Sequence, residues 1–399
     1  MPCFLLILNN SIYPALNSPQ KNYFCFLLYG FWIVIPFIPM APPFIALYYQ
    51  LSADIVAWIP LTLFFIVPFF FLLGNPPAVP AVNFGDQISP MLRIFLDMLL
   101  LVSIPLQIFM LFICARYWVN SDLSTITSLA FLVGVGFFSG LLAVNGGHEL
   151  LHPHHFFASS KKSKTGFLLL PITFANRLCK VLAVITLSTV CFGCFQEMHL
   201  SIHHKYVGTS KDHYTARRNQ TLYNFLFQNL LIYTKDVIQS MLCVLSLGNH
   251  NKAKASTNFS TLLSFVLVLV FYRHLGTQGV LFFMSQSVLA IILLEWINYL
   301  QHYGVVRKFN INGSLEPVRE WHTWCENYWF NNIFLLNLFR HSDHHINSHK
   351  PYYLLREVDF SLKYPYPFIA MMYLSLVPSV FFPIAHRVLD SNIQYHSNI

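Results

Sequence analysis

Four long stretches in the first part of the chain contain no charged side chain, and they cover residues 22–53, 55–85, 98–115 and 123–148. A helix that crosses a membrane needs about 20 predominantly apolar residues, because charges are costly in hydrocarbon and the backbone must bond to itself there. Two later stretches have the same character. We therefore predict membrane-spanning helices near residues 22–48, 55–74, 91–116, 125–148, 257–272 and 278–300.

The segments between these helices differ in composition. Repeated proline cannot continue a helix, so we expect residues 74–90 to form a loop. Residues 222–247 mix polar and apolar positions, which is typical of an amphipathic helix at the membrane interface. The run 181–196 is short for a span and is predicted to be buried or half inserted. Residues 366–385 contain two prolines, and an interfacial cap is favoured over a seventh span.

Together these elements predict the fold class and the domain organisation. The fold is expected to be an all-α, polytopic membrane bundle of about six transmembrane helices. It forms a single domain over residues 20–390, with a short N-terminal segment, 1–19, and a C-terminal tail, 391–399.

Composition supports a membrane protein and excludes several other classes. Apolar residues make up 55% of the 399 residues and charged residues only 10%, whereas a soluble domain carries roughly 25% charged residues. A soluble enzyme, a disordered tail protein and a nucleic-acid binder are therefore excluded. Most of the basic residues behind the net charge of +8 lie after residue 147. Because basic loops stay on the cytoplasmic side, that part of the chain is expected to face the cytoplasm, at the inner membrane if the protein is bacterial.

The distribution of histidine along the chain adds a second prediction, a metal site. The chain has 18 histidines, and none precedes His148. Nine of them fall in four clusters: His148 with His152, His199 with His203 and His204, a single His302, and His341 with His344 and His345. Two residues four apart share a helix face, so both imidazoles can reach one ion. Burying so many polar rings without partners would be costly, and metal ligation is the economical explanation.

The number of histidines bears on the kind of metal site. A catalytic zinc ion takes three protein ligands, and nine histidines exceed that number. Two ions with four or five nitrogen ligands each fit better. Residues 148–152 match the H-E-x-x-H pattern of zinc proteases, but that alternative leaves three clusters unexplained. The Cys191-x-x-Cys194 pair lies in an apolar run and is expected to pack rather than to bind zinc.

The four clusters together resemble the integral-membrane alkane 1-monooxygenases, the rubredoxin-dependent members of the membrane fatty-acid desaturase and hydroxylase superfamily. The most specific matches are NYLQHYGVVR at 298–307 and LFRHSDHH at 338–345. The resemblance implies a cytoplasmic non-haem site of two iron ions and oxygen insertion from O₂ into the terminal C–H bond of a linear alkane or similar apolar chain. It also implies that rubredoxin supplies the electrons. The iron ligands implied by the resemblance are His148, His152, His199, His203, His204, His302, His341, His344 and His345.

The chain also departs from the usual motifs of that family. Pro153 stands where a Lys is usual, Met198 where a Glu directly precedes the first histidine of the second cluster, and Ile202 where a Gly is usual. Gln301 replaces a Glu before His302. These changes leave all nine histidines in place, and they bear on the groups that orient the ligands and on substrate choice.

Several neighbouring residues are predicted to support the site. Candidates for orienting the ligands are Glu149, Asp212, Glu295, Asn298, His322 and Asp343. Candidates for docking an acidic electron-transfer protein are Arg217, Arg218, Arg319, Arg340 and Lys350, and anionic lipid head groups are an alternative partner for some of them. The additional histidines His154, His155 and His213 are interpreted as interfacial.

Two alternative functions stay open at this point. The first is a fatty-acyl or lipid desaturase or hydroxylase of the same superfamily, which Gln301 and the altered second cluster keep possible. The second is a non-enzymatic membrane protein that stores or senses metal. Product analysis with alkane and acyl substrates separates the first from alkane hydroxylation.

Overall fold

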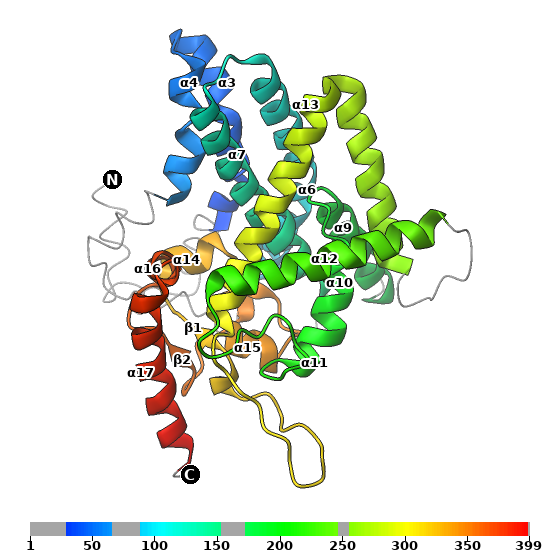
Figure 1. Cartoon of the computed structure of the whole chain (residues 1–399). Helices are drawn as coiled ribbons and strands as arrows, with labels where there is room; N and C mark the ends of the chain where they lie inside the picture. Colours follow the sequence, from blue (N-terminus) through cyan, green and yellow to red (C-terminus); the bar gives the residue numbers. More distant parts are fainter. Residues whose placement is uncertain (1–28, 66–87, 153–171, 246–254, 398–399) are drawn as a thin grey trace.

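A computed structural model of the chain describes residues 29–65, 88–152, 172–245 and 255–397, and this part is mostly helical (Figure 1). The predicted all-α character is confirmed. In this part, three helices are long and apolar enough to cross a membrane: Pro90–Asn120, Thr125–Leu151 and Ser256–Gln301. The count of about six spans stays a prediction. The expected segment 1–19, the loop 74–90 for most of its length and His154 and His155 lie outside the described residues.

The long helix α6 (Pro90–Asn120) begins and ends where its sequence dictates. The Ser89 hydroxyl accepts a hydrogen bond from the Leu92 backbone N–H at 3.2 Å, and Pro90 occupies the first helical position, where no N–H is needed. Ser121 ends the helix in an extended conformation. The helix predicted over 91–116 is therefore confirmed, and it continues for four more residues.

The next span carries the first histidines at its end. It begins as α7 (Thr125–Ser139), with the Ser124 hydroxyl as its cap, and continues as the π-helical segment η2 (Gly140–Asn145) and α8 (Gly146–Leu151). A π-helical turn inserts one extra residue and turns the following residues on the helix surface. The orientation of His148 is therefore set by η2.

The fifth and sixth predicted spans form one continuous run, α13 (Ala255–Gln301), which is bent back on itself (Figure 1). The bend lies at Gly276, whose φ of +62° and ψ of −155° are non-helical and favour glycine. The second arm packs closely against α7 and η2. Gly136 and Gly140, four residues apart, permit this approach, because a Cβ at Gly136 would lie 2.4 Å from Leu289 Cβ. His302 follows at the end of this arm.

Two further helices lie beside these spans. Helix α9 (Ile172–Ser188) packs against α8 and α13. The predicted helix at 181–196 thus ends at Ser188, and turns follow it. Helix α12 (Leu222–Leu245) confirms the helix predicted over 222–247 and crosses α13 at a steep angle (Figure 1). Its exposed side chains include Phe227, Leu231, Ile238, Leu242 and Leu245.

The segment predicted as a cap, 366–385, contains α16 (Phe368–Ser375) and the first part of α17 (Pro378–Ser397). Helix α16 is short, and α17 starts after a break and runs to the end of the described chain. Figure 1 shows α17 extending from α16 toward the end of the molecule opposite the bend at Gly276. Neither helix is among the three that are long and apolar enough to span.

Shorter elements complete the described chain. The N-terminal part contributes η1 (Phe31–Ile33), α3 (Phe37–Tyr49) and α4 (Ala53–Val56). The remaining short elements surround the histidines, and they are α10 (Phe195–Glu197), η3 (Met198–His203), α11 (His204–Tyr206), η5 (Glu320–His322), β1 (Trp324–Cys325), α14 (Trp329–Phe334), α15 (His341–Ile346), η6 (Tyr352–Leu354) and β2 (Leu362–Lys363). Strands β1 and β2 pair in parallel, Trp324 with Leu362 and Cys325 with Lys363.

Candidate metal centre

The nine histidines of the four sequence clusters come together in two neighbouring groups. Group A consists of His148, His152, His199, His204 and His344. Group B consists of His203, His302, His341 and His345. Within each group, one ring nitrogen per residue lies within 4.8 Å of all the others, which is close enough for one metal ion to bind them.

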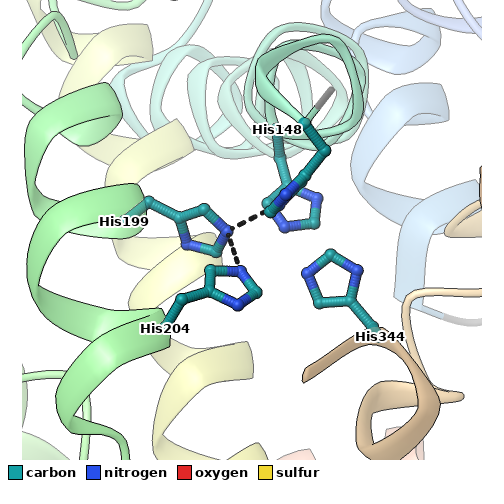
Figure 2. A group of neighbouring side chains, drawn as sticks. His148, His199, His204 and His344 are labelled. Carbon is teal, nitrogen blue, oxygen red and sulfur yellow. Dashed lines mark hydrogen bonds between the residues drawn. The ribbon is translucent and has the colours of Figure 1, made fainter. Parts of the chain in front are cut away.

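Group A gathers side chains from three segments of the chain. Figure 2 shows His148, His199, His204 and His344 pointing toward one another from the end of α8, from η3 and α11, and from α15. The Nε2 atom of His199 lies 3.1 Å from His152 Nε2 and 3.0 Å from His204 Nε2. His204 is partly exposed, and the other four members are buried.

Group B is fully buried and has a similar geometry. The Nε2 atom of His341 lies 2.9 Å from His302 Nε2 and 3.0 Å from His345 Nε2. The two groups adjoin, since the ring centroids of His204 and His345 are 4.6 Å apart and those of His203 and His345 are 4.7 Å apart. Nine nitrogen donors therefore form one continuous centre with two focal points.

The grouping differs from the i, i+4 rule that the sequence suggested. His199 and His203 are four apart but belong to different groups, whereas His199 and His204, five apart, share group A. The physical reason is that η3 (Met198–His203) is π-helical, and such a turn brings residues i and i+5 together. The rule is correct for His148 with His152 and for His341 with His345.

The electrostatics of the two groups suit metal binding. Burial, together with repulsion from neighbouring imidazoles, lowers the pKa of His199, His204, His341, His344 and His345 well below the ordinary value. These rings are therefore neutral at pH 7, which is the form that binds a metal. Among the residues that the structure describes, the buried Nε2 atoms of His203 and His344 have no hydrogen-bond partner. Buried imidazole nitrogens that are left without a hydrogen-bond partner fit a transition metal such as iron, zinc or copper.

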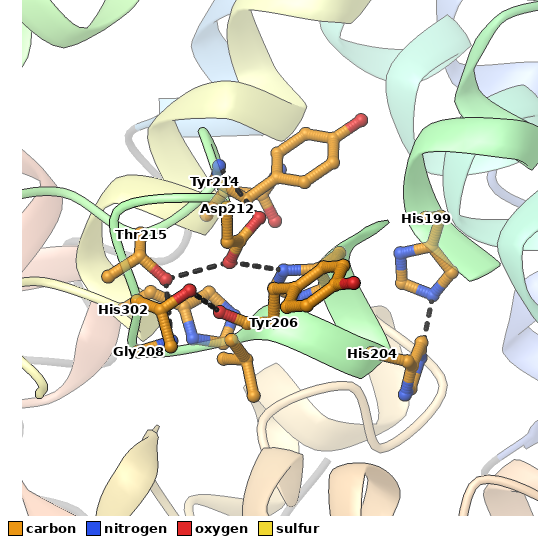
Figure 3. A network of polar contacts seen from close by, with 12 residues as sticks. His199, His204, Tyr206, Gly208, Asp212, Tyr214, Thr215 and His302 are labelled. Atoms are coloured by element: carbon orange, nitrogen blue, oxygen red, sulfur yellow. Dashed lines mark hydrogen bonds and ion pairs between the residues drawn. The ribbon is translucent and has the colours of Figure 1, made fainter. Parts of the chain in front are cut away.

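Asp212, one of the predicted supporting residues, contacts a group member. Its Oδ2 atom lies 2.9 Å from His203 Nδ1 and accepts a hydrogen bond from the Thr215 hydroxyl at 2.7 Å (Figure 3). Its Oδ1 atom accepts from the Tyr214 backbone N–H at 3.1 Å. A carboxylate on Nδ1 orients the ring and leaves Nε2 for a metal.

The other predicted supporting residues have different partners. Glu149 accepts a hydrogen bond from the Tyr352 backbone N–H at 2.7 Å and so ties η6 to α8. Asp343 pairs with Lys350 Nζ at 2.8 Å and also accepts from the Arg356 backbone N–H. Both residues therefore fix the chain next to group members.

Glu295 and Asn298 form a separate buried cluster on α13. Glu295 accepts hydrogen bonds from Asn229 Nδ2 at 2.7 Å, from the Tyr233 hydroxyl at 2.5 Å and from Asn298 Nδ2 at 3.3 Å. Its described hydrogen-bond partners thus include two residues of α12 and no imidazole. The cluster joins α12 to α13 two turns before His302.

His322 lies away from both groups. Its Nδ1 atom accepts from the Arg319 backbone N–H at 2.9 Å, and its Nε2 atom lies 3.4 Å from Glu316 Oε1. Burial lowers the pKa of His322 to about 4. Within the described chain it caps η5, and its role in orienting a group member stays a prediction.

The five residues predicted to dock an electron donor differ in their exposure and in their partners. Arg217 and Arg319 are exposed, and Arg218 forms an ion pair with Asp390 at 2.6 Å. Arg340 is only 2% exposed and donates to the Leu355 carbonyl and to Asn327 Oδ1. Its prediction as a docking residue is therefore wrong, because its guanidinium is enclosed. Lys350 is held by Asp343.

Sequence reasoning missed several residues that shape the centre. Phe195 stacks on His199 with ring centroids 4.9 Å apart, and Tyr214 meets His203 edge-on at 5.1 Å. Arg307 is buried between the chain after His204 and the chain after His302. In the sequence, Arg307 is the last residue of the NYLQHYGVVR match, for which no contact was predicted.

Comparison with known proteins shows the family to which the chain belongs. The chain belongs to the fatty acid desaturase family, which it matches over residues 124–373. It is 28% identical to Alkane 1-monooxygenase 2 of Alcanivorax borkumensis, over 92% of this chain and 90% of that protein. It is also 28% identical to Alkane 1-monooxygenase 1 of Pseudomonas aeruginosa, over 92% and 91% of the two chains.

A more distant relative covers a smaller region. The hydroxylase component of a xylene/toluene monooxygenase from Pseudomonas putida is 26% identical over 47% of this chain and 49% of that protein. The resemblance to alkane 1-monooxygenases that the motifs predicted is confirmed by the first two relatives. The described part of the chain contains three helices that are apolar and long enough to span, and the chain belongs to this family, so it is a membrane protein.

Proposed function

We propose that this protein is a membrane-bound non-haem di-iron monooxygenase that hydroxylates the terminal carbon of linear alkanes or similar apolar chains. The observation that carries the proposal is the convergence of nine histidines into adjoining groups of five and four. The alkane 1-monooxygenases that match about nine-tenths of the chain support the same reaction. O₂ is the oxygen source, and a rubredoxin-type protein is the electron donor.

In this proposal group A holds one iron ion and group B the other. When bound, the iron pair supplies the reduction of O₂ and the oxidation of the C–H bond. The chain supplies the rest. Asp212 holds His203 in one orientation through Nδ1, and the burial of eight of the nine rings excludes water from the centre.

An apolar cavity supports the choice of substrate. It has a volume of about 30 Å³, and its lining includes Leu141, Leu293, Ile297, Phe334 and Phe339. Leu141 precedes His148 by seven residues, Ile297 precedes His302 by five and Phe339 precedes His341 by two. Three segments that carry group members therefore also line the cavity, which suits the end of a hydrocarbon chain.

The placement in the membrane is part of the proposal. The protein is multi-pass, the apolar helices form the scaffold and the histidine centre faces the cytoplasm, at the inner membrane in a bacterium. The exposed apolar side chains of α12, such as Phe227 and Leu231, suit a helix at the lipid interface. The excess of basic residues after residue 147 supports this orientation.

The experiment that tests the function uses membranes containing the full chain, n-alkanes of graded length, O₂, rubredoxin and its reductase. The expected products are 1-alkanols, absent with the His302→Ala variant. Stoichiometric zinc without iron in the purified protein would contradict the proposal.

A second candidate function is desaturation or hydroxylation of fatty-acyl chains. Two observations favour it: the family match itself and Gln301, whose side chain donates to the Leu338 carbonyl at 3.1 Å where alkane hydroxylases usually carry a Glu. Acyl substrates supplied in the same membranes decide between the two. Desaturated acyl products without alkanols would establish this alternative.

A further inference from the structure

A projecting hairpin lies next to the metal centre. Figure 1 shows the segment after α13, in yellow, projecting at the end of the molecule opposite the bend at Gly276. The bridge between Phe309 and Leu315 and the bond from the Asn310 N–H to the Ser314 carbonyl, 2.7 Å, define it as a short hairpin. Val306 is 71% exposed, Phe309 61%, and Ile311 is fully exposed. Apolar side chains presented together in this way mark an interaction site.

The base of the hairpin is held firmly on the chain that carries the histidines. The Arg307 guanidinium donates to the carbonyls of Glu316 at 2.9 Å, Lys205 at 3.1 Å and Val207 at 3.2 Å. The Arg307 backbone N–H donates to the Gly208 carbonyl at 2.8 Å. The exposed apolar residues therefore stand on a fixed support that begins directly after His204 on one side and His302 on the other.

An open groove of about 460 Å³ lies between this hairpin and residues 208–220. Val306 and Phe309 line one side, and Arg217 and Arg218 line the other. Asp212 also lines the groove. Because Asp212 Oδ2 lies 2.9 Å from His203 Nδ1, this lining residue of the groove is in direct contact with group B.

The surroundings of the groove are basic. Exposed basic side chains on the segments that form the groove and its rim are Lys205, Lys211, Arg217, Arg218, Lys308 and Arg319. Asp390 pairs with Arg218, and Glu316 is partly exposed. A basic rim around apolar contacts attracts and orients an acidic protein.

We propose that this groove docks the electron donor, a small acidic one-electron carrier, and places it over the Asp212–His203 pair. The inference rests on the proposed function, in which RH, O₂, two electrons and two protons give ROH and H₂O. Two reduced carriers are oxidised in succession, and O₂ is reduced. The hairpin residues Val306 and Phe309 give apolar contact, and the arginines give long-range attraction.

The test measures binding and turnover separately. Purified rubredoxin is the probe, and the full chain is held in nanodiscs of phosphatidylcholine. We expect the double variant Phe309→Glu with Arg217→Glu to weaken rubredoxin binding at low salt by at least about tenfold. The KM for rubredoxin should rise by a similar factor, while turnover driven by a chemical reductant stays unchanged. The matched control is Phe360→Glu with Arg356→Glu, because Phe360 is 59% exposed, Arg356 is exposed and neither lines the groove.

The outcomes separate this inference from the proposed function. Alkane hydroxylation by the wild type with a chemical reductant supports the function alone. Unchanged rubredoxin binding and KM in the groove variant, with an active wild type, would overturn the docking inference. The docking inference would also be overturned if the groove variant loses binding to phosphatidylserine vesicles but keeps rubredoxin binding, because the surface would then contact lipid. Equal losses in the groove and control variants would also overturn it, because the loss of net positive charge would then be sufficient to cause them.

Discussion

The two histidine groups are built from overlapping parts of the chain but have different surroundings. The segment η3–α11 and helix α15 contribute to both, whereas α8 contributes only to group A and the end of α13 only to group B. Group A is bordered by the Phe195 ring, which stacks on His199. Group B is bordered by Asp212, which also lines the groove beside the hairpin. The two proposed metal ions are therefore expected to respond differently to substitution.

The shared segments also explain why the groups must form together. His203 and His204 are consecutive in the segment η3–α11 but belong to different groups. The same is true of His344 and His345 in α15. A shift of η3 or α15 would therefore disturb both groups. A change at α8 or at the end of α13 should disturb one, and this difference makes the comparison testable.

The largest effect is expected from removing a histidine that belongs to a non-shared segment. His302→Ala should lose the proposed metal ion of group B and keep that of group A, and His148→Ala should do the reverse. Both should lower hydroxylation by more than about a hundredfold, because ligand loss exceeds the effect of losing an outer partner. Metal analysis and Mössbauer spectroscopy of the purified variants measure this.

The control for that prediction is His213→Ala, since His213 is outside both groups. It should keep both ions. If His302→Ala and His148→Ala each lose all of the metal, the division into two groups has no functional meaning and the nine histidines act as one unit.

The sequence predicted which histidines gather but not how they divide. The nine residues could be found because buried imidazoles without partners are costly, and a shared metal ion removes that cost in a chain that carries few charges. Their division depends on the π-helical turn at η3, which separates His199 from His203, and no residue pattern in Met198–His203 indicated that turn. Helix periodicity assumes a regular α-helix, and this is the assumption that failed.

The prediction of the fold from the sequence has a similar limit. Apolar length alone predicted α6, the run 125–151 and both arms of α13, because hydrocarbon-spanning helices follow from composition. The burial of Arg340 was not predictable, since its partners, the Leu355 carbonyl and Asn327, come from loops whose course is set by tertiary contacts. The same is true of the hairpin after His302, where Arg307 connects the two segments.

A smaller effect, confined to group B, is expected from Asp212→Asn. The amide keeps the size but cannot stabilise the orientation of His203 in the same way, and losing such a partner typically costs about 10- to 100-fold in metal affinity or activity. Iron release to a chelator should show one weakened and one unchanged ion. Asp390→Asn is the matched control, because Asp390 pairs with the exposed Arg218 and lies outside α15 and both groups. Equal weakening of both ions by Asp212→Asn would contradict the assignment of Asp212 to group B.

Glu295 tests whether α12 supports group B from a distance. In Glu295→Ala, the buried Asn229 amide and Tyr233 hydroxyl lose their acceptor, which should lower the free energy of unfolding by about 3 kcal/mol. Glu295→Gln keeps an acceptor and should cost less than half of that. Thermal unfolding and hydrogen exchange measure both, and exchange should increase in α12 and at the end of α13 while α8 is unchanged. An equal increase in α8 would show that the cluster supports the whole fold.

The smallest effect is expected from His322, which lies outside both groups and should make the stability of the fold sensitive to acid. Burial lowers the pKa of His322 to about 4, whereas the unfolded chain has its ordinary value near 6.5. Below pH 6.5 the unfolded state therefore binds more protons than the folded state, so stability falls as the pH falls toward 4. Between pH 7 and pH 5 the loss from His322 should be about 2 kcal/mol. His322→Asn keeps an acceptor for the Arg319 N–H and should flatten the fall in melting temperature over that range. If the fall is as steep as in the wild type, acid sensitivity comes from the histidines of groups A and B, whose pKa values burial also lowers.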